Sequence, residues 1–134
     1  MEKANILVVD DDKEIAELVG IHLREEGYEV YKAYSGKEAL KIFKQERIDL
    51  VILDVMMPVM NGYEATKMIR SMDRSDAKKI PIIAMTANAF VEDRIKSKEA
   101  GMNEHVSKPI DMKLLVKIIA ELAGKIKIVR IKDE

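Results

Sequence analysis

Three aspartates stand at the ends of two strongly apolar stretches of this chain. Asp10 and Asp11 directly follow residues 6–9, and Asp54 directly follows residues 50–53. Stretches this apolar are typical of parallel strands covered on both faces, and open α/β sheets carry their chemistry at the carboxyl ends of such strands. Acids gathered at one sheet edge repel each other unless a positive charge lies among them. The spacing therefore indicates phosphoryl chemistry at a carboxylate, with a lysine or a divalent metal beside it.

Two more polar residues are expected at the same edge of the sheet. Lys108 follows the short stretch 105–107, and Thr86 ends the apolar stretch 82–86. Lys108 would pair with a phosphoryl oxygen, and the hydroxyl of Thr86 would donate to another. Each residue alone has an ordinary explanation, such as a helix cap, a turn or a β-branched strand residue. Their coincidence at four strand ends is what indicates a site.

Mg²⁺ is the metal that suits such a site. It is a hard cation that prefers oxygen ligands, keeps several waters and bridges carboxylates to phosphate oxygens. We expect Asp10 and Asp11 to form an acidic cradle, with Asp54 on the remaining side and the backbone carbonyl of Met56 as a further ligand. Asp54 would be the nucleophile that forms an acyl phosphate. Ala87 is small enough to leave the pocket open, and the backbones of Ala87 and Met56 are expected to contact the phosphoryl group.

The elements that position these residues alternate regularly along the chain. The expected strands are 6–9, 29–34, 48–54, 82–86 and 105–107, and apolar residues at helical spacing follow each of them. Five strands alternating with five helices imply right-handed crossovers and a parallel sheet. For the three acids to meet, the first and third strands must be neighbours. A doubly wound, flavodoxin-like α/β fold with strand order 2-1-3-4-5 satisfies this condition.

The composition is that of a soluble globular protein. The 134 residues are 48% hydrophobic and 35% charged, with a net charge of -1. This balance argues against non-specific binding to nucleic acid or membranes, and no apolar stretch approaches the ~20 residues that span a bilayer. There is no cysteine, which fits a reducing compartment. We therefore expect a cytoplasmic protein without nucleic-acid or membrane partners.

The chain is expected to form one domain over residues 1–124, followed by a tail over residues 125–134. Residues 125–128 alternate between lysine and isoleucine like a strand, and Val129 breaks the alternation. Three interpretations of the tail stay open: an added edge strand, the start of a linker, or a frayed end.

The chain resembles the receiver (response-regulator) domains of two-component signalling. The resemblance rests on residues 6–11, 54–62, 84–87 and 106–110, and it covers about residues 4 to 123. The sequence at residues 85–89 and 101–105 is similar to that of receivers attached to hybrid sensor kinases.

That resemblance implies a role for each residue of the site. Asp54 would accept a phosphoryl group from a phosphohistidine of a histidine kinase or a histidine phosphotransfer protein, with Asp10 and Asp11 in the Mg²⁺ site. Thr86 and Lys108 would sense the group, and the surface around the fourth helix, fifth strand and fifth helix would change. It also implies a cis Lys-Pro peptide and a signalling receiver rather than an enzyme. Whether the chain forms a homodimer stays open.

His105 is a departure from the family pattern. Many receivers keep tyrosine or phenylalanine at this position, as a rotating partner of the threonine. Histidine could also rotate, and it would add a proton equilibrium near neutral pH. The alternative is a partly exposed strand histidine without a switching role.

Two rival functions use the same residues differently. Asp10 and Asp12 also satisfy the Asp-x-Asp pattern of haloacid-dehalogenase-like phosphatases, where they would be nucleophile and general acid. Those enzymes usually carry threonine or valine at the position of Glu14, and need further acids after a later strand. In that interpretation Asp54 would have no role. The second rival is a pseudo-receiver, a binding module that is not phosphorylated.

Overall fold

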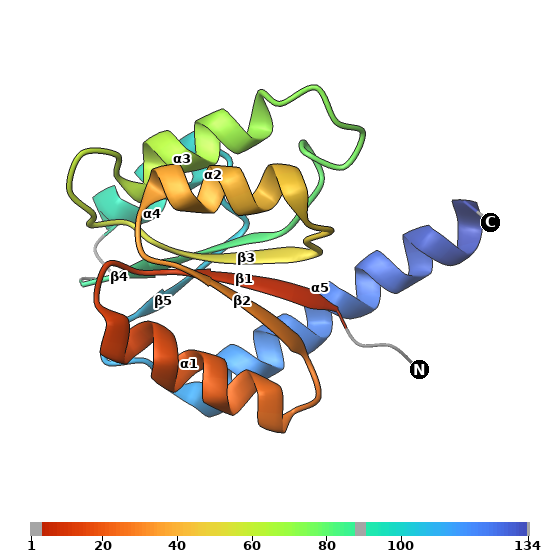
Figure 1. Cartoon of the computed structure of the whole chain (residues 1–134), viewed down its shortest axis with the longest axis horizontal. Helices are drawn as coiled ribbons and strands as arrows, with labels where there is room; N and C mark the ends of the chain where they lie inside the picture. Colours follow the sequence, from red (N-terminus) through yellow and green to blue (C-terminus); the bar gives the residue numbers. More distant parts are fainter. Residues whose placement is uncertain (1–3, 88–90, 134) are drawn as a thin grey trace.

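The computed structural model describes residues 4–87 and 91–133, which form a parallel sheet with helices on both faces (Figure 1). The strands are β1 (Asn5–Val9), β2 (Glu29–Ala33), β3 (Leu50–Asp54), β4 (Ile82–Thr86) and β5 (Glu104–Ser107). The helices are α1 (Lys13–Glu25), α2 (Gly36–Gln45), α3 (Gly62–Arg70), α4 (Val91–Ala100) and α5 (Met112–Asp133). The strand order is β2-β1-β3-β4-β5, which confirms the predicted doubly wound, flavodoxin-like α/β fold.

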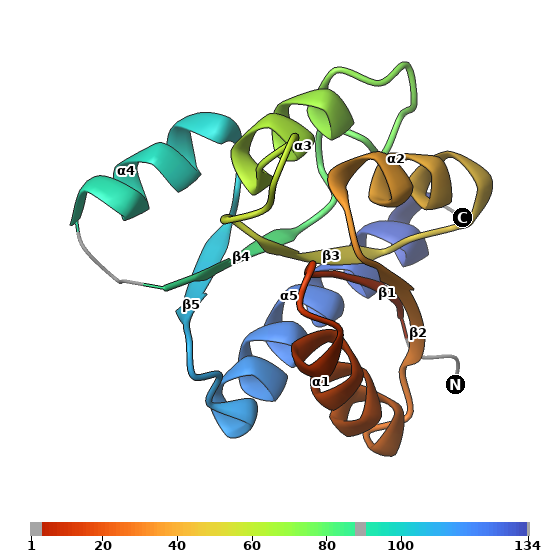
Figure 2. The same cartoon turned by 60° about the vertical axis from the view of Figure 1, so that its left-hand side comes forward.

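Two hydrophobic layers hold the helices against the sheet. Helices α1 and α5 cover one face, and α2, α3 and α4 cover the other (Figure 2). In β1, Leu7 and Val9 belong to the layer under α2 and α3, whereas Ile6 and Val8 belong to the layer under α1 and α5. Successive strand residues point to opposite faces, so a strand buried on both sides needs an unbroken apolar run. This is why the strands that carry the site residues are so apolar.

Polar side chains start the helices that follow the strands. Asp12 caps α1, where its Oδ1 accepts hydrogen bonds from the amides of Glu14 (3.0 Å) and Ile15 (3.4 Å). Asn61 caps α3 in a reciprocal capping box with Glu64. Each cap satisfies amide groups that have no partner within the helix. The side chain of Asp12 is therefore engaged at the start of α1, whereas the side chains of Asp10 and Asp11 can contribute to the site.

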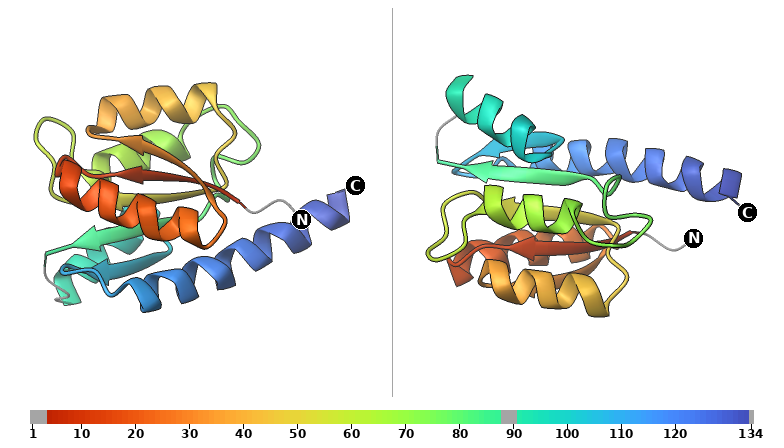
Figure 3. Two further views of the ribbon diagram at one scale, coloured as in Figure 1. Left: turned by 60° about the horizontal axis from the view of Figure 1, so that its bottom comes forward. Right: turned by 90° about the horizontal axis from the view of Figure 1, so that it is seen from above.

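The tail is helical rather than an added edge strand. Helix α5 continues through residues 125–133 and extends past the sheet (Figure 3). Apolar residues recur along it with a spacing of four and three: Leu115, Ile119, Leu122, Ile126 and Val129. This periodicity is typical of a helix and no proline interrupts it, so it prevails over the short alternation in residues 125–128. The edge-strand interpretation is therefore wrong.

The other differences from the prediction are small. β3 begins at Leu50 rather than at residue 48, and β5 begins at Glu104 rather than at residue 105. The fourth helix is predicted to begin near Phe90, which lies outside the described residues. Among the helices of the described part, none combines the length and the apolar composition needed to cross a bilayer.

Candidate functional site

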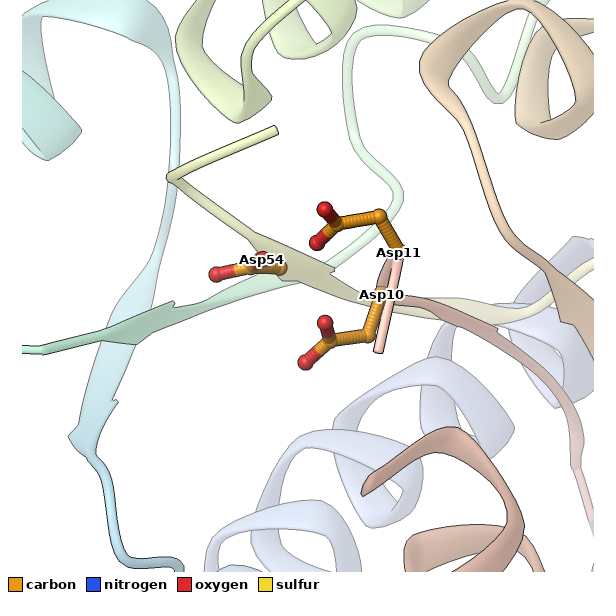
Figure 4. Close-up of side chains that lie close together, drawn as sticks. All are labelled: Asp10, Asp11 and Asp54. Atoms are coloured by element: carbon orange, nitrogen blue, oxygen red, sulfur yellow. The ribbon is translucent and has the colours of Figure 1, made fainter. Parts of the chain in front are cut away.

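The parallel register of β1 and β3 brings Asp10 and Asp54 to the same edge of the sheet. Val9 pairs with Leu53, so the next residue of each chain segment stands beside its neighbour. One carboxylate oxygen from each of Asp10, Asp11 and Asp54 lies within 4.8 Å of the others. Figure 4 shows the three side chains extending to the same side of the strand ends. The fold thus brings together acids that are far apart in the chain.

The three acids differ in their exposure to solvent. Asp10 is fully buried and Asp54 is 2% exposed, whereas Asp11 is exposed. Asp10 Oδ1 accepts a hydrogen bond from the amide of Asp12 (2.9 Å), and Asp54 Oδ1 accepts one from the amide of Met56 (3.3 Å). A buried carboxylate requires such donors because it has lost its water. The site therefore has a buried floor, with Asp11 at its solvent side.

Lys108 places its ammonium group between the two buried acids. Its Nζ lies 3.0 Å from Asp10 Oδ2 and 3.2 Å from Asp54 Oδ1. The amide of Lys108 donates to the carbonyl of Thr86 at 2.8 Å, which fixes this segment to the end of β4. The peptide bond between Lys108 and Pro109 is cis, as the family resemblance implies. One lysine cannot balance three carboxylates, so the site keeps an excess of negative charge.

The electrostatics of the site favour a further cation. Burial, followed by the negative charge of Asp10, raises the pKa of Asp54 to about 6, although Lys108 opposes this rise. Burial alone would lower the pKa of Lys108, but the hydrogen bond to Asp10 and the charge of Asp54 together raise it. The positive charge of Lys108 thus does not fully offset the cost of ionising Asp54. Additional positive charge beside it would favour the ionised, nucleophilic form.

The residues expected to act as a switch lie on the last two strands. Thr86 is buried at the end of β4, and its Oγ1 donates to the carbonyl of Val106 at 3.5 Å. The hydroxyl is thus turned toward β5. His105 is half-buried on β5, opposite Ala84 in the β4–β5 ladder.

Met56 and Ala87 lie at the exposed margin of the site. The side chain of Met56 is 71% exposed, while its amide donates to Asp54 as described above. Ala87 is exposed directly after β4. A metal contact through the carbonyl of Met56 and phosphoryl contacts through both backbones stay predictions.

The donor set fits Mg²⁺. All three acids offer carboxylate oxygens, the ligand type that this hard cation prefers, and their oxygens lie close enough to share one ion. Asp10 Oδ2 is buried and, apart from the ion pair with Lys108, accepts no hydrogen bond among the described residues. An oxygen in this state retains lone pairs for a metal.

Gly62 supports the site in a way that the sequence does not reveal. The pair Asn61-Gly62 looks like an ordinary turn signal, yet Gly62 is the first residue of α3 and packs against the backbone at the end of β3. Its amide donates to the carbonyl of Val55 at 2.9 Å. A Cβ on Gly62 would lie 2.4 Å from the carbonyl oxygen of Asp54 and 2.8 Å from the Cα of Val55. Backbone atoms cannot move aside as a flexible side chain would.

Gly62→Ala should destabilise the protein by about 2 kcal/mol, because the added methyl group forces the backbone at Asp54 to shift. Urea denaturation measures this change. A matched control is Gly20→Ala in α1, where the new Cβ would make only ordinary contacts of 3.6 Å. That control should be neutral or slightly stabilising, since alanine favours a helix. Equal stability of the two variants would show that Gly62 has no such role.

Comparison with known proteins identifies the family. The model of the response regulator receiver domain matches residues 6–120, so the chain belongs to this family. A probable transcriptional regulator, ycf27, from Porphyridium aerugineum is 42% identical over 115 residues, which are 86% of this chain and 46% of that protein. The CAI-1 autoinducer sensor kinase/phosphatase CqsS from Vibrio cholerae is 39% identical over 115 residues, 86% of this chain and 17% of that protein. The chain thus spans half or less of these two relatives.

The solved structures similar to this chain are receiver domains, including those of sensor histidine kinases. One is the receiver domain of the sensor histidine kinase PA1611 from Pseudomonas aeruginosa, with a magnesium ion coordinated in its active site cleft. It is 34% identical to this chain, with a TM-score of 0.82, and the match covers 91% of this chain and 98% of that one. The family and the fold are thereby established as those of two-component signalling receivers.

Proposed function

We propose that Asp54 of this receiver accepts a phosphoryl group from the phosphohistidine of a histidine kinase or a histidine phosphotransfer protein. In the transfer, the bond between phosphorus and the imidazole nitrogen breaks, and a bond from an Asp54 carboxylate oxygen to phosphorus forms. The observation that carries the proposal is the gathering of Asp10, Asp11 and Asp54 within 4.8 Å, with Lys108 3.2 Å from Asp54. Little covalent help is needed, because positioning and charge neutralisation supply most of the rate in phosphoryl transfer.

The residues that would hold Mg²⁺ are Asp10, Asp11, Asp54 and the backbone carbonyl of Met56. Bound Mg²⁺ supplies positive charge that neutralises the carboxylates and the incoming phosphoryl oxygens. The magnesium ion in the cleft of the similar PA1611 receiver supports this assignment. Lys108 pairs with a phosphoryl oxygen, and the backbones of Met56 and Ala87 contact the others.

The same residues would convert phosphorylation into a change of surface. The Thr86 hydroxyl exchanges its contact with the Val106 carbonyl for one with a phosphoryl oxygen, and Lys108 is drawn to the same group. Thr86 contacts the carbonyl of Val106 in β5, and Lys108 directly follows β5 in the chain, so the change passes to α4, β5 and α5. His105 is the candidate rotating partner of Thr86 on that surface.

The protein would act as a signalling module rather than as a metabolic enzyme, although it would promote its own phosphorylation and dephosphorylation. The receiver domain comprises residues 1–124, in the cytoplasm, without direct contact to nucleic acid or membranes.

The phosphatase alternative is disfavoured by the position of Asp12. In such an enzyme Asp12 would be the general acid beside a nucleophilic Asp10. The Asp12 side chain instead accepts hydrogen bonds from two amides at the start of α1. Asp54, which has no role in that alternative, is buried and lies 3.2 Å from Lys108, at nearly the same distance as Asp10 (3.0 Å).

Labelling with acetyl phosphate tests the proposed function. The protein should gain the mass of one phosphoryl group when Mg²⁺ is present and none when the metal is chelated. Peptide mapping after borohydride trapping of the acyl phosphate should locate the label on Asp54. A label on Asp10 would support the phosphatase, and the absence of any label would support the pseudo-receiver.

A further inference from the structure

Arg70 ends α3 with a guanidinium group that binds carbonyl oxygens instead of an acid. Its Nη1 donates to the carbonyls of Ala77 (3.0 Å) and Ile80 (2.6 Å). Its Nε and Nη2 both donate to the carbonyl of Gly101 (3.1 and 2.7 Å), and Nη2 also donates to Asn103 Oδ1 (2.9 Å). No acid of the described part forms an ion pair with it. The group is half-buried and has lost part of its water, so breaking these contacts would leave its charge unsatisfied.

These contacts fix the turn between α4 and β5 to the rest of the domain. Gly101 has a φ of 105°, the left-handed conformation that ends many helices and favours glycine. A Cβ at this position would lie 3.2 Å from the Cγ of Arg70, so the glycine also leaves room for Arg70 to cover the turn. Asn103 Oδ1 accepts the amide of Ile82 (2.9 Å), and the amide of Asn103 donates to the carbonyl of Ile82 (2.8 Å). The C-terminal end of α4 is therefore attached both to α3 and to the start of β4.

The rest of α4 is weakly attached to the domain. Its buried residues are Ser97 and Ala100, which are both small. Val91 and Ile95, which are larger and apolar, are 68% and 51% exposed. Because the burial of apolar area is what holds a helix against its neighbours, α4 gains little from packing. Figure 2 shows α4 at the edge of the molecule, at the outer end of its helical layer. Its attachment is thus concentrated at the end that Arg70 holds.

We propose that α4 is hinged at Gly101, with Arg70 as the anchor that keeps this end in place while the rest of the helix turns. The inference rests on the proposed function, in which Thr86 contacts the phosphoryl group. Thr86 ends β4 and precedes the start of α4, so the signal enters the helix at the end away from Arg70. The helix has ten residues and is about 15 Å long, so a turn of about 15° about Gly101 moves its start by about 4 Å. A small change beside the site thereby becomes a larger displacement of the exposed side chain of Val91.

Amide hydrogen exchange measured by NMR, with and without excess acetyl phosphate and Mg²⁺, tests the hinge in the parent protein. The amides of Gly101 and Met102 donate to carbonyls in the last turn of α4, at 3.0 and 2.9 Å, so their exchange reports on the anchored end. Phosphorylation should change the exchange rates of residues 95–97 by at least about threefold. The rates of Gly101 and Met102 should change by less than about twofold, because Arg70 holds this end in both states.

Arg70→Gln should release the anchored end, because glutamine is neutral and has two N–H donors in place of five. The exchange of Gly101 and Met102 should accelerate at least about tenfold. Labelling by acetyl phosphate should stay within about twofold of the parent rate, since none of the hydrogen bonds of Arg70 described above reaches a residue of the site. Arg70→Lys keeps the charge with fewer donors, should show a smaller acceleration, and replaces the first variant if glutamine prevents folding.

The matched control is Arg74→Gln. Arg74 also donates through Nη1 to a main-chain carbonyl, that of Phe43 in α2, which lies away from the turn between α4 and β5. This control loosens a similar contact elsewhere in the domain, so it should leave the exchange of Gly101 and Met102 within about twofold of the parent.

The outcomes separate this inference from the proposed function. Phosphorylation that alters Gly101 and Met102 as much as residues 95–97, or that alters neither, would overturn the hinge alone. Parent exchange rates at Gly101 in both Arg70 variants, or an equal acceleration in Arg74→Gln, would do the same. A parent that acetyl phosphate does not label would overturn the proposed function, and this inference with it.

Discussion

Asp54→Asn should abolish Mg²⁺-dependent labelling by acetyl phosphate and, in metal-free buffer, make the protein more stable. The amide has no nucleophilic carboxylate, so the label is lost completely. Stability rises because the variant no longer buries an ionised acid next to Asp10. The pKa of Asp54 is raised in the folded protein from 3.8 to about 6. Folding therefore disfavours the ionised form, and the substitution removes that penalty.

Because the pKa of Asp54 is raised by folding, the stability gained in Asp54→Asn should depend on pH. A raised pKa means that the folded protein binds more protons than the unfolded chain between about pH 4 and 6, so the stability of the parent falls as the pH rises through this range. Above about pH 6, Asp54 is ionised in both states and the full cost of burying its charge lowers the stability of the parent. We expect Asp54→Asn to gain about 1 to 2 kcal/mol at about pH 7.5, a value reduced by the loss of one partner of Lys108. Most of this gain should disappear at about pH 4.5, where Asp54 of the parent is largely neutral.

Thermal denaturation of both proteins in chelator at the two pH values measures this difference. Asp12→Asn is the matched control, because asparagine is an equally good helix cap and Asp12 is exposed. That control should be labelled normally and should show no pH-dependent gain. A loss of stability in Asp54→Asn at about pH 7.5, or an equal gain at both pH values, would contradict the electrostatic explanation.

The parts of the site that depend on strand order could be predicted from the sequence. Asp10 and Asp54 each follow a strand buried on both faces, and a parallel register leaves little choice of where such residues lie. Lys108 could be placed for the same reason. These inferences need only the ends of strands, which apolar runs mark clearly.

What the sequence could not reveal depends on backbone contacts and rotamers. The sequence does not say where the hydroxyl of Thr86 donates, and only the structure shows that it donates to the carbonyl of Val106. The close approach of Gly62 to the backbone of Asp54 and the positive φ of Val59 follow from how α3 packs, which the turn signal does not encode. The helical tail was ambiguous because residues 125–128 satisfy a strand pattern and a helix pattern at once.

Lys108→Met should make the stability of the protein depend strongly on Mg²⁺. The variant keeps an aliphatic side chain of similar length but leaves Asp10 and Asp54 buried together without their shared cation. Removing one partner from a buried charge cluster is strongly destabilising, because the remaining charges are uncompensated. Lys108 is itself 24% exposed, so we expect a loss of about 2 kcal/mol in chelator, less than the roughly 3 to 5 kcal/mol that breaking a fully buried pair costs.

Added Mg²⁺ should restore much of this loss, because a divalent cation bound to the same carboxylates replaces the missing positive charge. An ion present at ten times its dissociation constant stabilises the folded state by about 1.4 kcal/mol, and the variant should bind it more tightly than the parent. Urea denaturation with and without Mg²⁺ measures both effects. The control is Lys32→Met, which breaks an ion pair with Glu17 away from the site and should lose less stability, with no additional response to Mg²⁺. If Mg²⁺ stabilised Lys108→Met no more than the parent, the lysine and the metal would not share one cluster of carboxylates. The phosphoryl group would then lack the two sources of positive charge on which the proposed transfer depends.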